Sequence, residues 1–200
     1  MNKKIQQFLF FLAGLVVSIG FDQWTKYLAV VKLKGKQPFV IWDGVFELYY
    51  SENRGAAFGM MQGKQGFFFL IAIAVIAVVV FLLFRMPSDK KYLPFTGCLF
   101  LLVSGAAGNM IDRVANGYVV DFLYFKLIDF PIFNVADCYV VISTLLLILL
   151  FFFVYSDEEL EFLSFGRQKN KNRRMENNRK RRMQFETGIH CSGKKLRPAN

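Results

Sequence analysis

Four long apolar stretches alternate with shorter polar segments along the chain. They cover about residues 5–31, 67–84, 92–110 and 135–155, and the second and third contain no charged residue. A helix needs about 20 apolar residues to cross the roughly 30 Å hydrocarbon core of a bilayer. The pattern therefore predicts a membrane protein whose spanning part is all-α, with four transmembrane helices.

The two segments that follow the first and third stretches lie on the same side of the membrane if all four stretches span it. The first of them contains a run of aromatic and β-branched residues, 39–50, around the Asp43-Gly44 pair. Such a pair between apolar runs is typical of a hairpin turn. Residues 117–124 have a similar composition. The sequence therefore predicts a small sheet on the outer face, to which residues 117–124 add a strand.

The basic charge of the chain is concentrated in its C-terminal part. Residues 156–200 carry a net charge of +6 out of the formal +10 of the whole chain. Lys and Arg favour the cytoplasmic side of a membrane. Because residues 32–66 also contain five basic residues, the tail decides the orientation, and we expect both termini in the cytoplasm.

The same change in composition predicts two parts of different character. We expect a four-span membrane domain over residues 1–155 and a basic, disordered cytoplasmic tail over residues 156–200. Such a tail is attracted to anionic lipid. A nucleic-acid patch is the alternative, but no aromatic residues are regularly interleaved with the charges, so we expect no nucleic-acid partner.

The content of His and Cys argues against several kinds of chemistry. His190 in the tail is the one His of the chain, which disfavours a His-based triad, a multi-His zinc site and a haem with His ligands. Cys98, Cys138 and Cys191 match no metal-binding spacing and no disulfide framework. We therefore expect neither a metal nor a cofactor.

Polar and ionisable residues occur inside or at the ends of the apolar stretches, where they are costly and therefore functional candidates. They are Asp22, Lys26, Asn109, Asp112, Arg113, Asn134 and Asp137. The first and third stretches end on the outer side and the fourth begins there, so these residues share one depth. Together with Asn53 and Asp121 from the connecting segments, they predict one polar cluster at the outer face.

Two carboxyl groups of this cluster have different surroundings. Asp137 lies near the N-terminus of a predicted helix, where the helix dipole and free N–H groups stabilise negative charge. Asp121 lies between Val120 and Phe122, an apolar setting that raises the pKa of a carboxyl group. Two such carboxyls close together can share one proton, so that one acts as base toward water while the other polarises a carbonyl group.

The same residues also have structural interpretations. Asn109, Asp112 and Arg113 share one helical face, and Asp112 next to Arg113 fits an ion pair or a contact at a helix end. Asp22 and Lys26, at i and i+4, fit a structural ion pair.

Further residues of the cluster are equally ambiguous. Asp137 alone fits a helix cap, and Asp121 alone fits a loop acid. Gly55 and Gly59 suit a close approach of the backbone, and the glycines of the third stretch suit helix packing. Composition alone therefore does not single out a catalytic pair.

Five short motifs lie in order along the stretches and the outer segments. They are Asp22-Gln-Trp-Thr-Lys26, Asn53-Arg-Gly-Ala-Ala-Phe-Gly59, Gly108-Asn-Met-Ile-Asp-Arg113, Val119-Val-Asp-Phe122 and Phe133-Asn-Val-Ala-Asp137. Together they resemble the lipoprotein signal peptidase family, also called signal peptidase II, over about residues 5–155. Two departures are small: Met110 stands where Leu or Phe is common, and Cys138 stands where Ser is frequent.

The resemblance implies an aspartic endopeptidase of the bacterial cytoplasmic (inner) membrane. The family removes signal peptides from diacylglyceryl-modified prolipoproteins, cleaving just before the lipidated Cys, and globomycin is its inhibitor. Its fold has four transmembrane helices, a small outer-face β-cradle and a short outer helix. We therefore expect prolipoprotein substrates, contact with membrane lipid, a monomer, and an active site near the outer face.

The resemblance also implies a role for individual residues. Asp121 and Asp137 match the catalytic pair of the family. The positions that match substrate-binding residues are Asn53, Asn109, Arg113 and Asn134, and those that match supporting residues are Asp22, Gly55, Gly108 and Asp112.

Other functions remain open from the residues alone. A small transporter or channel subunit would use the acids as an ion path, although acids at one face and the lack of an internal repeat fit a surface cleft better. A membrane scaffold would use the same acids only to satisfy helix ends. A Ser–Lys peptidase is disfavoured because no Ser lies near Lys26 in the sequence.

Overall fold

The computed structural model describes residues 2–55, 65–163, 179 and 183 of the chain. The chain divides into two units, Met1–Tyr155 and Ser156–Asn200. In the second unit the described segment includes the 3-10 helix η5 (Glu161–Leu163). The tail was predicted to be disordered. Most of its residues, from 164 to 200 except 179 and 183, are not among those that the structure describes, so the disorder stays a prediction.

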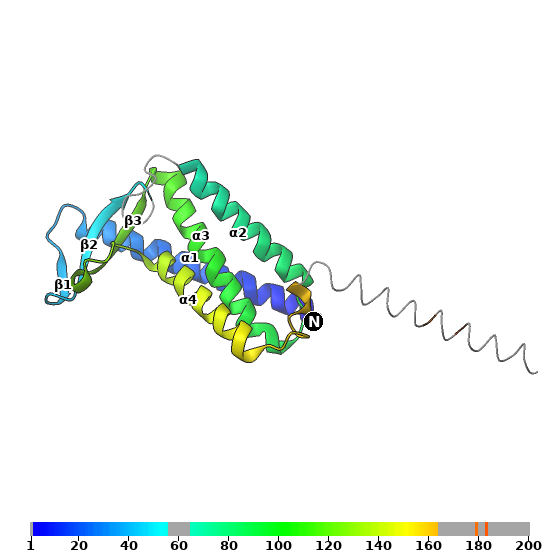
Figure 1. Ribbon diagram of the computed structural model, residues 1–200. Coiled ribbons are helices and arrows are strands. Elements are labelled where there is room, and N and C mark those ends of the chain that lie inside the picture. The colour runs from blue at the N-terminus through cyan, green and yellow to red at the C-terminus, as the bar shows by residue number, and fades with distance from the viewer. Residues whose placement is uncertain (1, 56–64, 164–178, 180–182, 184–200) are drawn as a thin grey trace, which may run out of the picture. The chain divides into compact units, whose positions relative to one another are not determined.

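Four helices of the first unit are long and apolar enough to cross a membrane. They are α1 (Lys3–Leu33), α2 (Gln65–Arg85), α3 (Leu93–Asn116, preceded by the 3-10 helix η2, Lys90–Tyr92) and α4 (Val135–Leu149, continued by the π-helix η4, Leu150–Val154). The four predicted spans are therefore confirmed. The start of α1 and the end of α4 lie at the same end of the bundle (Figure 1).

The third helix extends further than its apolar stretch. It continues through polar residues beyond Met110 to Asn116 and ends at Gly117, whose φ of 78° gives a left-handed cap. The apolar stretch ends near these polar residues, yet Asp112 is buried and Arg113 is half-buried within the protein. The additional turns carry part of the polar cluster.

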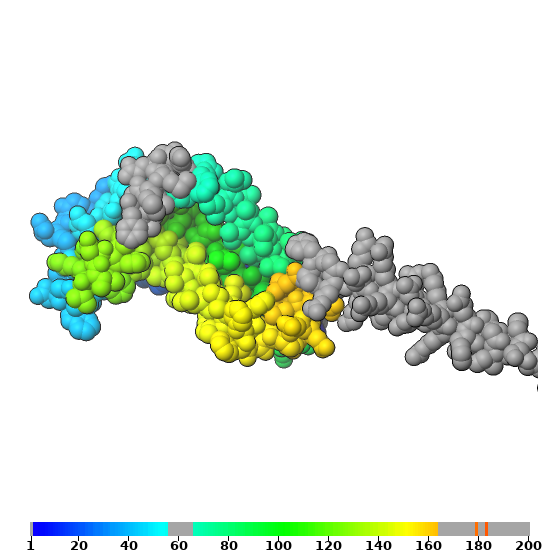
Figure 2. Space-filling model, viewed as in Figure 1, coloured from blue at the N-terminus to red at the C-terminus, as the bar shows by residue number. Residues whose placement is uncertain are grey.

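The same helix packs against each of the other three. A Cβ atom at Gly105 would lie only 2.5 Å from the carbonyl oxygen of Ala136 at the start of α4. Gly105 is thus a packing position, as predicted, whereas a Cβ at Gly97 would meet nothing closer than Phe100 at 3.9 Å. In Figure 2, α4 (yellow) lies on the near face, with α3 (green) visible between it and α2.

A three-stranded antiparallel sheet lies at the end of the bundle opposite the start of α1 (Figure 1). Its strands, in order, are β1 (Phe39–Trp42), β2 (Phe46–Asn53) and β3 (Val119–Phe125). The predicted turn at Gly44 is present, with a φ of 69° that suits glycine. Both the predicted hairpin and the predicted third strand are therefore confirmed.

The register of the sheet determines which residues meet. Ser51 pairs with Asp121 and Asn53 pairs with Val119 across β2 and β3. Because side chains alternate between the two faces of a strand, Asn53 and Asp121 lie on one face. After β3 the chain forms the 3-10 helix η3 (Lys126–Ile128) and returns, and Phe133 then forms a bridge with Leu123. This return places the start of α4 beside β3.

Candidate active site

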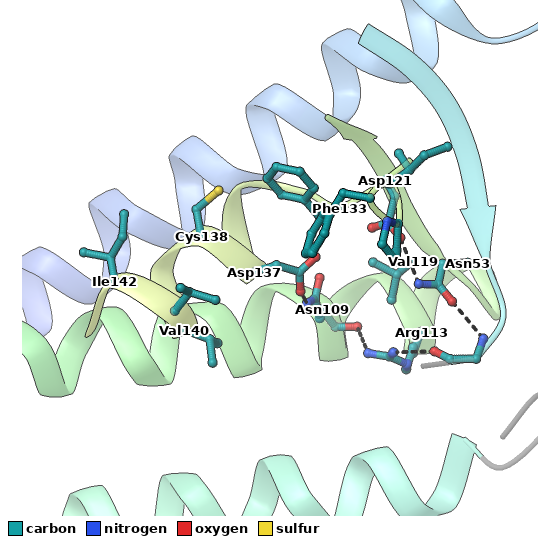
Figure 3. Close-up of a pocket in the computed structure, with 15 residues that line it drawn as sticks. Asn53, Asn109, Arg113, Val119, Asp121, Phe133, Asp137, Cys138, Val140 and Ile142 are labelled. Atoms are coloured by element: carbon teal, nitrogen blue, oxygen red, sulfur yellow. Dashed lines mark hydrogen bonds between the residues drawn. The ribbon is translucent and has the colours of Figure 1, made fainter. Parts of the chain in front are cut away.

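The sheet and the helix ends enclose a cavity of about 560 Å³, called here the active-site cavity. Its polar lining comes from four elements: Asn53 on β2, Asn109 and Arg113 on α3, Asp121 on β3 and Asp137 on α4. Figure 3 shows these side chains together with the apolar residues around them. The structure therefore brings the predicted polar cluster together, and Gly55 lines the same cavity.

Asp121 lies on β3 with its side chain almost fully buried. Asn134 donates to its Oδ1 over 2.7 Å, and Asn53 donates to its Oδ2 over 2.9 Å. Burial, and secondarily the negative charge of Asp137, raise the pKa of Asp121 to about 7, although the two amide donors act in the opposite direction. Near neutral pH this carboxyl group is therefore present in both its protonated and its ionised form.

Asp137 is the third residue of α4 and forms a capping box with Asn134. Its Oδ2 accepts from the backbone N–H of Asn134 over 3.1 Å, and its Oδ1 accepts from the side chain of Asn109 over 2.8 Å. The predicted helix cap is therefore present. This capping role does not exclude a catalytic role for Asp137, because the same carboxylate lines the active-site cavity.

Asn134 joins the two carboxyl groups through one fully buried side chain. Its Nδ2 donates both to Asp121 over 2.7 Å and to the Oδ1 of Asn109 over 3.0 Å. Its Oδ1 accepts from the backbone N–H of Asp137 over 3.1 Å. The position of each carboxyl therefore depends on the same amide.

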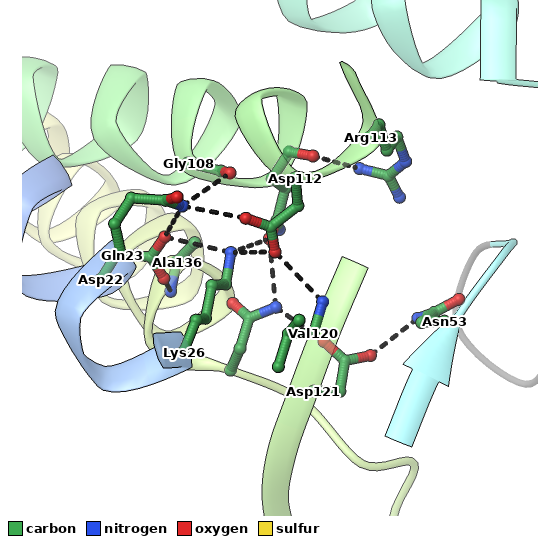
Figure 4. A network of polar contacts seen from close by, with 12 residues as sticks. Asp22, Gln23, Lys26, Asn53, Gly108, Asp112, Arg113, Val120, Asp121 and Ala136 are labelled. Carbon is green, nitrogen blue, oxygen red and sulfur yellow. Dashed lines mark hydrogen bonds and ion pairs between the residues drawn. The ribbon is translucent and has the colours of Figure 1, made fainter. Parts of the chain in front are cut away.

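Beneath the cavity, Lys26 is the centre of a buried ionic network (Figure 4). Its Nζ lies 3.0 Å from Asp22 and 3.1 Å from Asp112, and it donates to the Oδ1 of Asn109 over 2.9 Å. Buried charges persist only when they are paired and hydrogen-bonded. The predicted Asp22–Lys26 pair is confirmed, whereas Asp112 pairs with Lys26 rather than with Arg113 because its side chain faces α1.

The two acids of this network also hold the elements that carry the carboxyl pair. Asp22 accepts from the backbone N–H of Ala136 in the first turn of α4 over 2.9 Å. Asp112 accepts from the backbone N–H of Val120, next to Asp121, over 3.1 Å. Gly108 leaves room for this arrangement, because a Cβ there would lie 2.5 Å from Oδ2 of Asp22.

Gln23 completes the network and was not singled out by the sequence. Its Nε2 donates to Asp22 over 3.1 Å, to Asp112 over 3.0 Å and to the backbone oxygen of Gly108 over 3.2 Å. The only signal for it was its place inside the first motif. We define the Lys26 network as Asp22, Gln23, Lys26 and Asp112.

Arg113 lies at the wall of the active-site cavity next to α2. Its guanidinium donates to the backbone oxygens of Asn109 and Gly55, each over 3.3 Å. The guanidinium carbon also lies 4.5 Å from the centre of the Phe68 ring, a cation–π distance. Its positive charge therefore faces the same space as the two carboxyls.

The rest of the active-site cavity is apolar, and the sequence did not predict which residues form it. One apolar residue, Val119, comes from β3. The others precede and follow the start of α4: Phe130, Pro131, Ile132, Phe133, Val140, Val141 and Ile142, with Cys138 among them. Such a surface suits a hydrocarbon or peptide chain. Among the described residues, no three His, Cys, Asp or Glu side chains form a group that fits a metal ion.

Comparisons with known proteins show which family the chain resembles. The sequence model of the family described as Signal peptidase (SPase) II matches residues 14–153. Lipoprotein signal peptidase of Streptococcus thermophilus (strain CNRZ 1066) is 41% identical over 133 residues, which are 66% of this chain and 86% of that protein. The lipoprotein signal peptidase of Caldanaerobacter subterraneus is 43% identical over 126 residues, 62% of this chain and 83% of that protein.

Two solved structures are similar as well, both described as bacterial membrane enzymes determined by the in meso method. One, at 2.3 Å resolution, superposes with a TM-score of 0.63 at 34% identity and covers 70% of this chain and 86% of its own. The other, at 1.9 Å resolution, has a TM-score of 0.62 at 33% identity. The match covers 72% of this chain and 94% of the chain in that structure. With a family match that extends from α1 to the end of α4, this chain belongs to the signal peptidase II family and is a multi-pass membrane peptidase.

Proposed function

We propose that this protein is an aspartic endopeptidase that removes signal peptides from diacylglyceryl-modified prolipoproteins, just before the lipidated Cys. The observation that carries the proposal is that two carboxyls, Asp121 and Asp137, line one cavity, where side-chain amides donate hydrogen bonds to both. The names of the curated relatives support the substrate class.

The proposed reaction begins with a water molecule between the two carboxyls and the scissile carbonyl group. Asp137, as the carboxylate, takes a proton from the water, while the oxygen of the water forms a bond to the carbonyl carbon. Asp121, as the acid, donates its proton to the developing oxyanion. Asp121 takes the acid role because its raised pKa, about 7, keeps it protonated where an ordinary Asp is ionised.

Collapse of the tetrahedral intermediate completes the cycle. Asp137 returns its proton to the leaving nitrogen, the carbon–nitrogen bond breaks, and Asp121 recovers a proton from the hydroxyl of the intermediate. Both carboxyls then regain their initial states. The reaction needs no covalent enzyme intermediate, and we propose that it needs neither a metal nor a cofactor.

The remaining polar residues of the cavity are suited to hold the substrate. Asn53 and Arg113 present polar groups that can bind the backbone of an extended peptide, with Asn109 and Asn134 orienting the carboxyls and the adjacent carbonyl. The apolar residues on both sides of the start of α4 suit the diacylglyceryl chains. Globomycin, as a substrate-like peptide inhibitor, would occupy the same cavity.

The four supporting residues position the elements that carry the carboxyl pair. Asp22 and Asp112 position α4 and β3 through backbone N–H groups. Gly108 gives Asp22 its space, and Gly55 satisfies the oxygen of Asn53, whose Nδ2 then points to Asp121. We assign them no contact with the reacting atoms.

We place the protein in the bacterial cytoplasmic membrane as a monomer, with both termini in the cytoplasm. An even number of spans supports placing the ends together, and the basic C-terminal residues favour the cytoplasmic side. The sheet and the carboxyl pair would then lie near the outer face. This is the side on which a translocated signal peptide presents its cleavage site.

The test is cleavage of a lipid-modified prolipoprotein by purified Asp121→Asn, Asp137→Asn and double-variant protein. Each single change should lower the rate by about a thousandfold or more, and the double change should cost little beyond that, because the pair acts as a unit. Asp129→Asn removes an exposed acid of the same outer segment and serves as the matched control.

Two results would contradict the proposal. Near-normal cleavage by well-inserted Asp121→Asn or Asp137→Asn protein would rule out the aspartic mechanism. Equal cleavage of the precursor before and after diacylglyceryl modification would rule out the proposed substrate class. EDTA and serine-directed reagents should leave the activity intact.

A further inference from the structure

A second cavity, of about 630 Å³, lies on the other face of the sheet from the carboxyl pair. One side is a stripe of α1 at helical spacing: Thr25, Leu28, Ala29, Lys32 and Leu33. The other side is formed by Phe39 of β1, Leu48 of β2 and Phe122 of β3. This volume is in the range of sites that hold small organic ligands, about 300–1,000 Å³.

The side chains beside the cavity are typical of a membrane interface. The cavity borders the last turns of α1, close to Trp24 and Tyr27, which are both more than half exposed. Trp and Tyr side chains with this exposure are typical of the boundary between hydrocarbon and headgroups. Phe39 at the rim is 60% exposed, so the cavity is open to its surroundings. At such an interface, the opening of the cavity would face lipid molecules.

Charge and apolar surface are separated along the cavity. Its deep part is formed by apolar side chains such as Ala29 and Phe122, which are both buried. Lys32, in the last turn of α1, and Lys36, beyond its end, also line the cavity, and no Asp or Glu of the described residues lines it. Neither lysine side chain has a hydrogen bond or ion pair to another residue that the structure describes.

The nearby acid is already engaged elsewhere. Glu52 pairs with Lys34 over 2.9 Å and with Arg54 over 3.4 Å, and it does not line the cavity. The hydrogen bond from Lys34 lowers the pKa of Glu52 to about 2, so this acid stays ionised beside its partners. The two cavity lysines therefore keep their positive charge available to an anion.

We propose that this second cavity binds one anionic phospholipid, with an acyl chain against Leu28, Ala29 and Phe122 and the phosphate between Lys32 and Lys36. An apolar depth with two cations at the interface complements a phosphate that carries hydrocarbon chains. A zwitterionic lipid would bring its own cation next to the lysines. A soluble phosphate would leave the apolar part unfilled.

The site lies directly behind the proposed catalytic pair. Asp121 lines the active-site cavity and Phe122, the next residue of β3, lines the second cavity. Successive side chains of a strand point to opposite faces, so one strand separates the two. A bound acyl chain would fill the space behind β3 and limit its movement. This second effect rests on the proposed function, whereas the binding itself does not.

The test measures lipid retention rather than cleavage. The full chain is purified in a mild detergent and titrated with phosphatidylglycerol or with phosphatidylcholine of the same acyl chains, and bound lipid is counted by native mass spectrometry. We expect one phosphatidylglycerol to be retained in preference to phosphatidylcholine. Lys32→Gln with Lys36→Gln should weaken this binding about thirtyfold, as expected for two basic residues near an anionic headgroup.

Three further variants separate the site from general surface charge. Lys34→Gln removes a neighbouring charge that pairs with Glu52 and should leave retention unchanged. Lys32→Arg with Lys36→Arg keeps both charges and should retain the lipid. Leu28→Trp keeps both lysines but narrows the apolar part of the cavity where the acyl chain would lie, so it should weaken retention of the lipid.

The outcomes that overturn the proposal are equally specific. Equal retention of the two lipids, or an equal loss in Lys34→Gln, would show that no site selects the anionic headgroup. Unchanged retention by Leu28→Trp would show that the acyl chain does not lie against this stripe of α1. Displacement of the lipid by soluble glycerol 3-phosphate at similar concentration would identify a phosphate site instead.

Discussion

The side-chain amide of Asn109 donates to Asp137 over 2.8 Å. Its orientation is determined from the other side, because its oxygen accepts from Lys26 over 2.9 Å and from Asn134 over 3.0 Å. Two donors on one oxygen leave only the nitrogen to face the carboxylate. A buried cation on α1 thus acts, through one amide, on a carboxyl group at the start of α4.

This relationship predicts two separable effects of Lys26. Lys26→Met leaves Asp22 and Asp112 buried without their cation, which should cost about 3–5 kcal/mol of stability. Adding Asp22→Asn and Asp112→Asn removes the uncompensated charges, so thermal melting of this triple variant should approach that of the wild type. Its kcat should nevertheless stay low at unchanged KM, because Asn109 is no longer held. A fully active triple variant would make Lys26 purely structural.

The raised pKa of Asp121 predicts a pH profile. If Asp121 is the acid, kcat/KM should fall tenfold per pH unit above its pKa of about 7, where the free enzyme loses this proton. The hydrogen bond from Asn53 lowers that pKa, so Asn53→Ala should move the falling limb to higher pH, whatever it does to the rate. If the falling limb of the kcat/KM profile stays at the same pH in Asn53→Ala, the limb reports the titration of a group other than Asp121.

The same pKa predicts how stability changes with pH. The folded pKa lies above the value of 3.8 expected for an exposed Asp, so the wild type loses stability as pH rises from about 4 to about 7. At about 1.4 kcal/mol per pKa unit, the loss in the free energy of unfolding is about 4 kcal/mol. The Asp121→Asn variant has no carboxyl group at this position, so its stability does not fall with pH for this reason.

The melting temperature of Asp121→Asn relative to the wild type should therefore rise between about pH 4 and pH 8. The variant should also be less stable than the wild type by an amount that does not change with pH. Its new amide nitrogen is a donor and faces the donor group of Asn53 or Asn134. Asp129→Asn, an exposed change of the same charge, is the comparison. A difference that is flat across this range would contradict a raised pKa for Asp121.

The spans and the sheet were predictable because their signals are local. Twenty apolar residues predict a span, and Asp43-Gly44 between aromatic runs predicts the hairpin. The apolar stretch of α3 ends before the helix does, because hydropathy does not tell whether a polar residue faces lipid or protein. Asn116 and Gly117 mark the true end through the left-handed cap.

The polar cluster was predictable as a group, but its internal contacts were not. Which partner Asp112 takes depends on how α1 packs against α3, a contact between residues more than 80 positions apart. Gln23 has no sequence periodicity that distinguishes it from a surface residue. The second cavity was also not foreseen, since it exists only where α1 meets the far face of β3.

The tail should not be needed for cleavage. Among the described residues, all that line the active-site cavity or belong to the Lys26 network precede Tyr155. Removing residues 164–200 should leave the specific activity of correctly inserted protein largely unchanged. It should weaken binding to anionic membranes by at most about 1 kcal/mol per basic residue near the surface. Loss of cleavage by a well-inserted truncated protein would make the tail part of the mechanism.

Cys138 offers a chemical test of the active-site cavity. Its half-buried thiol lines the cavity immediately after Asp137, whereas Cys98 is buried between helices. A maleimide added to Cys138 would occupy space needed by the substrate, so N-ethylmaleimide should inhibit the wild type. Cys138→Ser should be active and resistant, and Cys98→Ser and Cys191→Ser should stay sensitive. A bound peptide inhibitor should slow the modification of Cys138. If Cys138→Ser is inhibited as strongly as the wild type, the inhibition arises elsewhere and this wall of the cavity does not face the substrate.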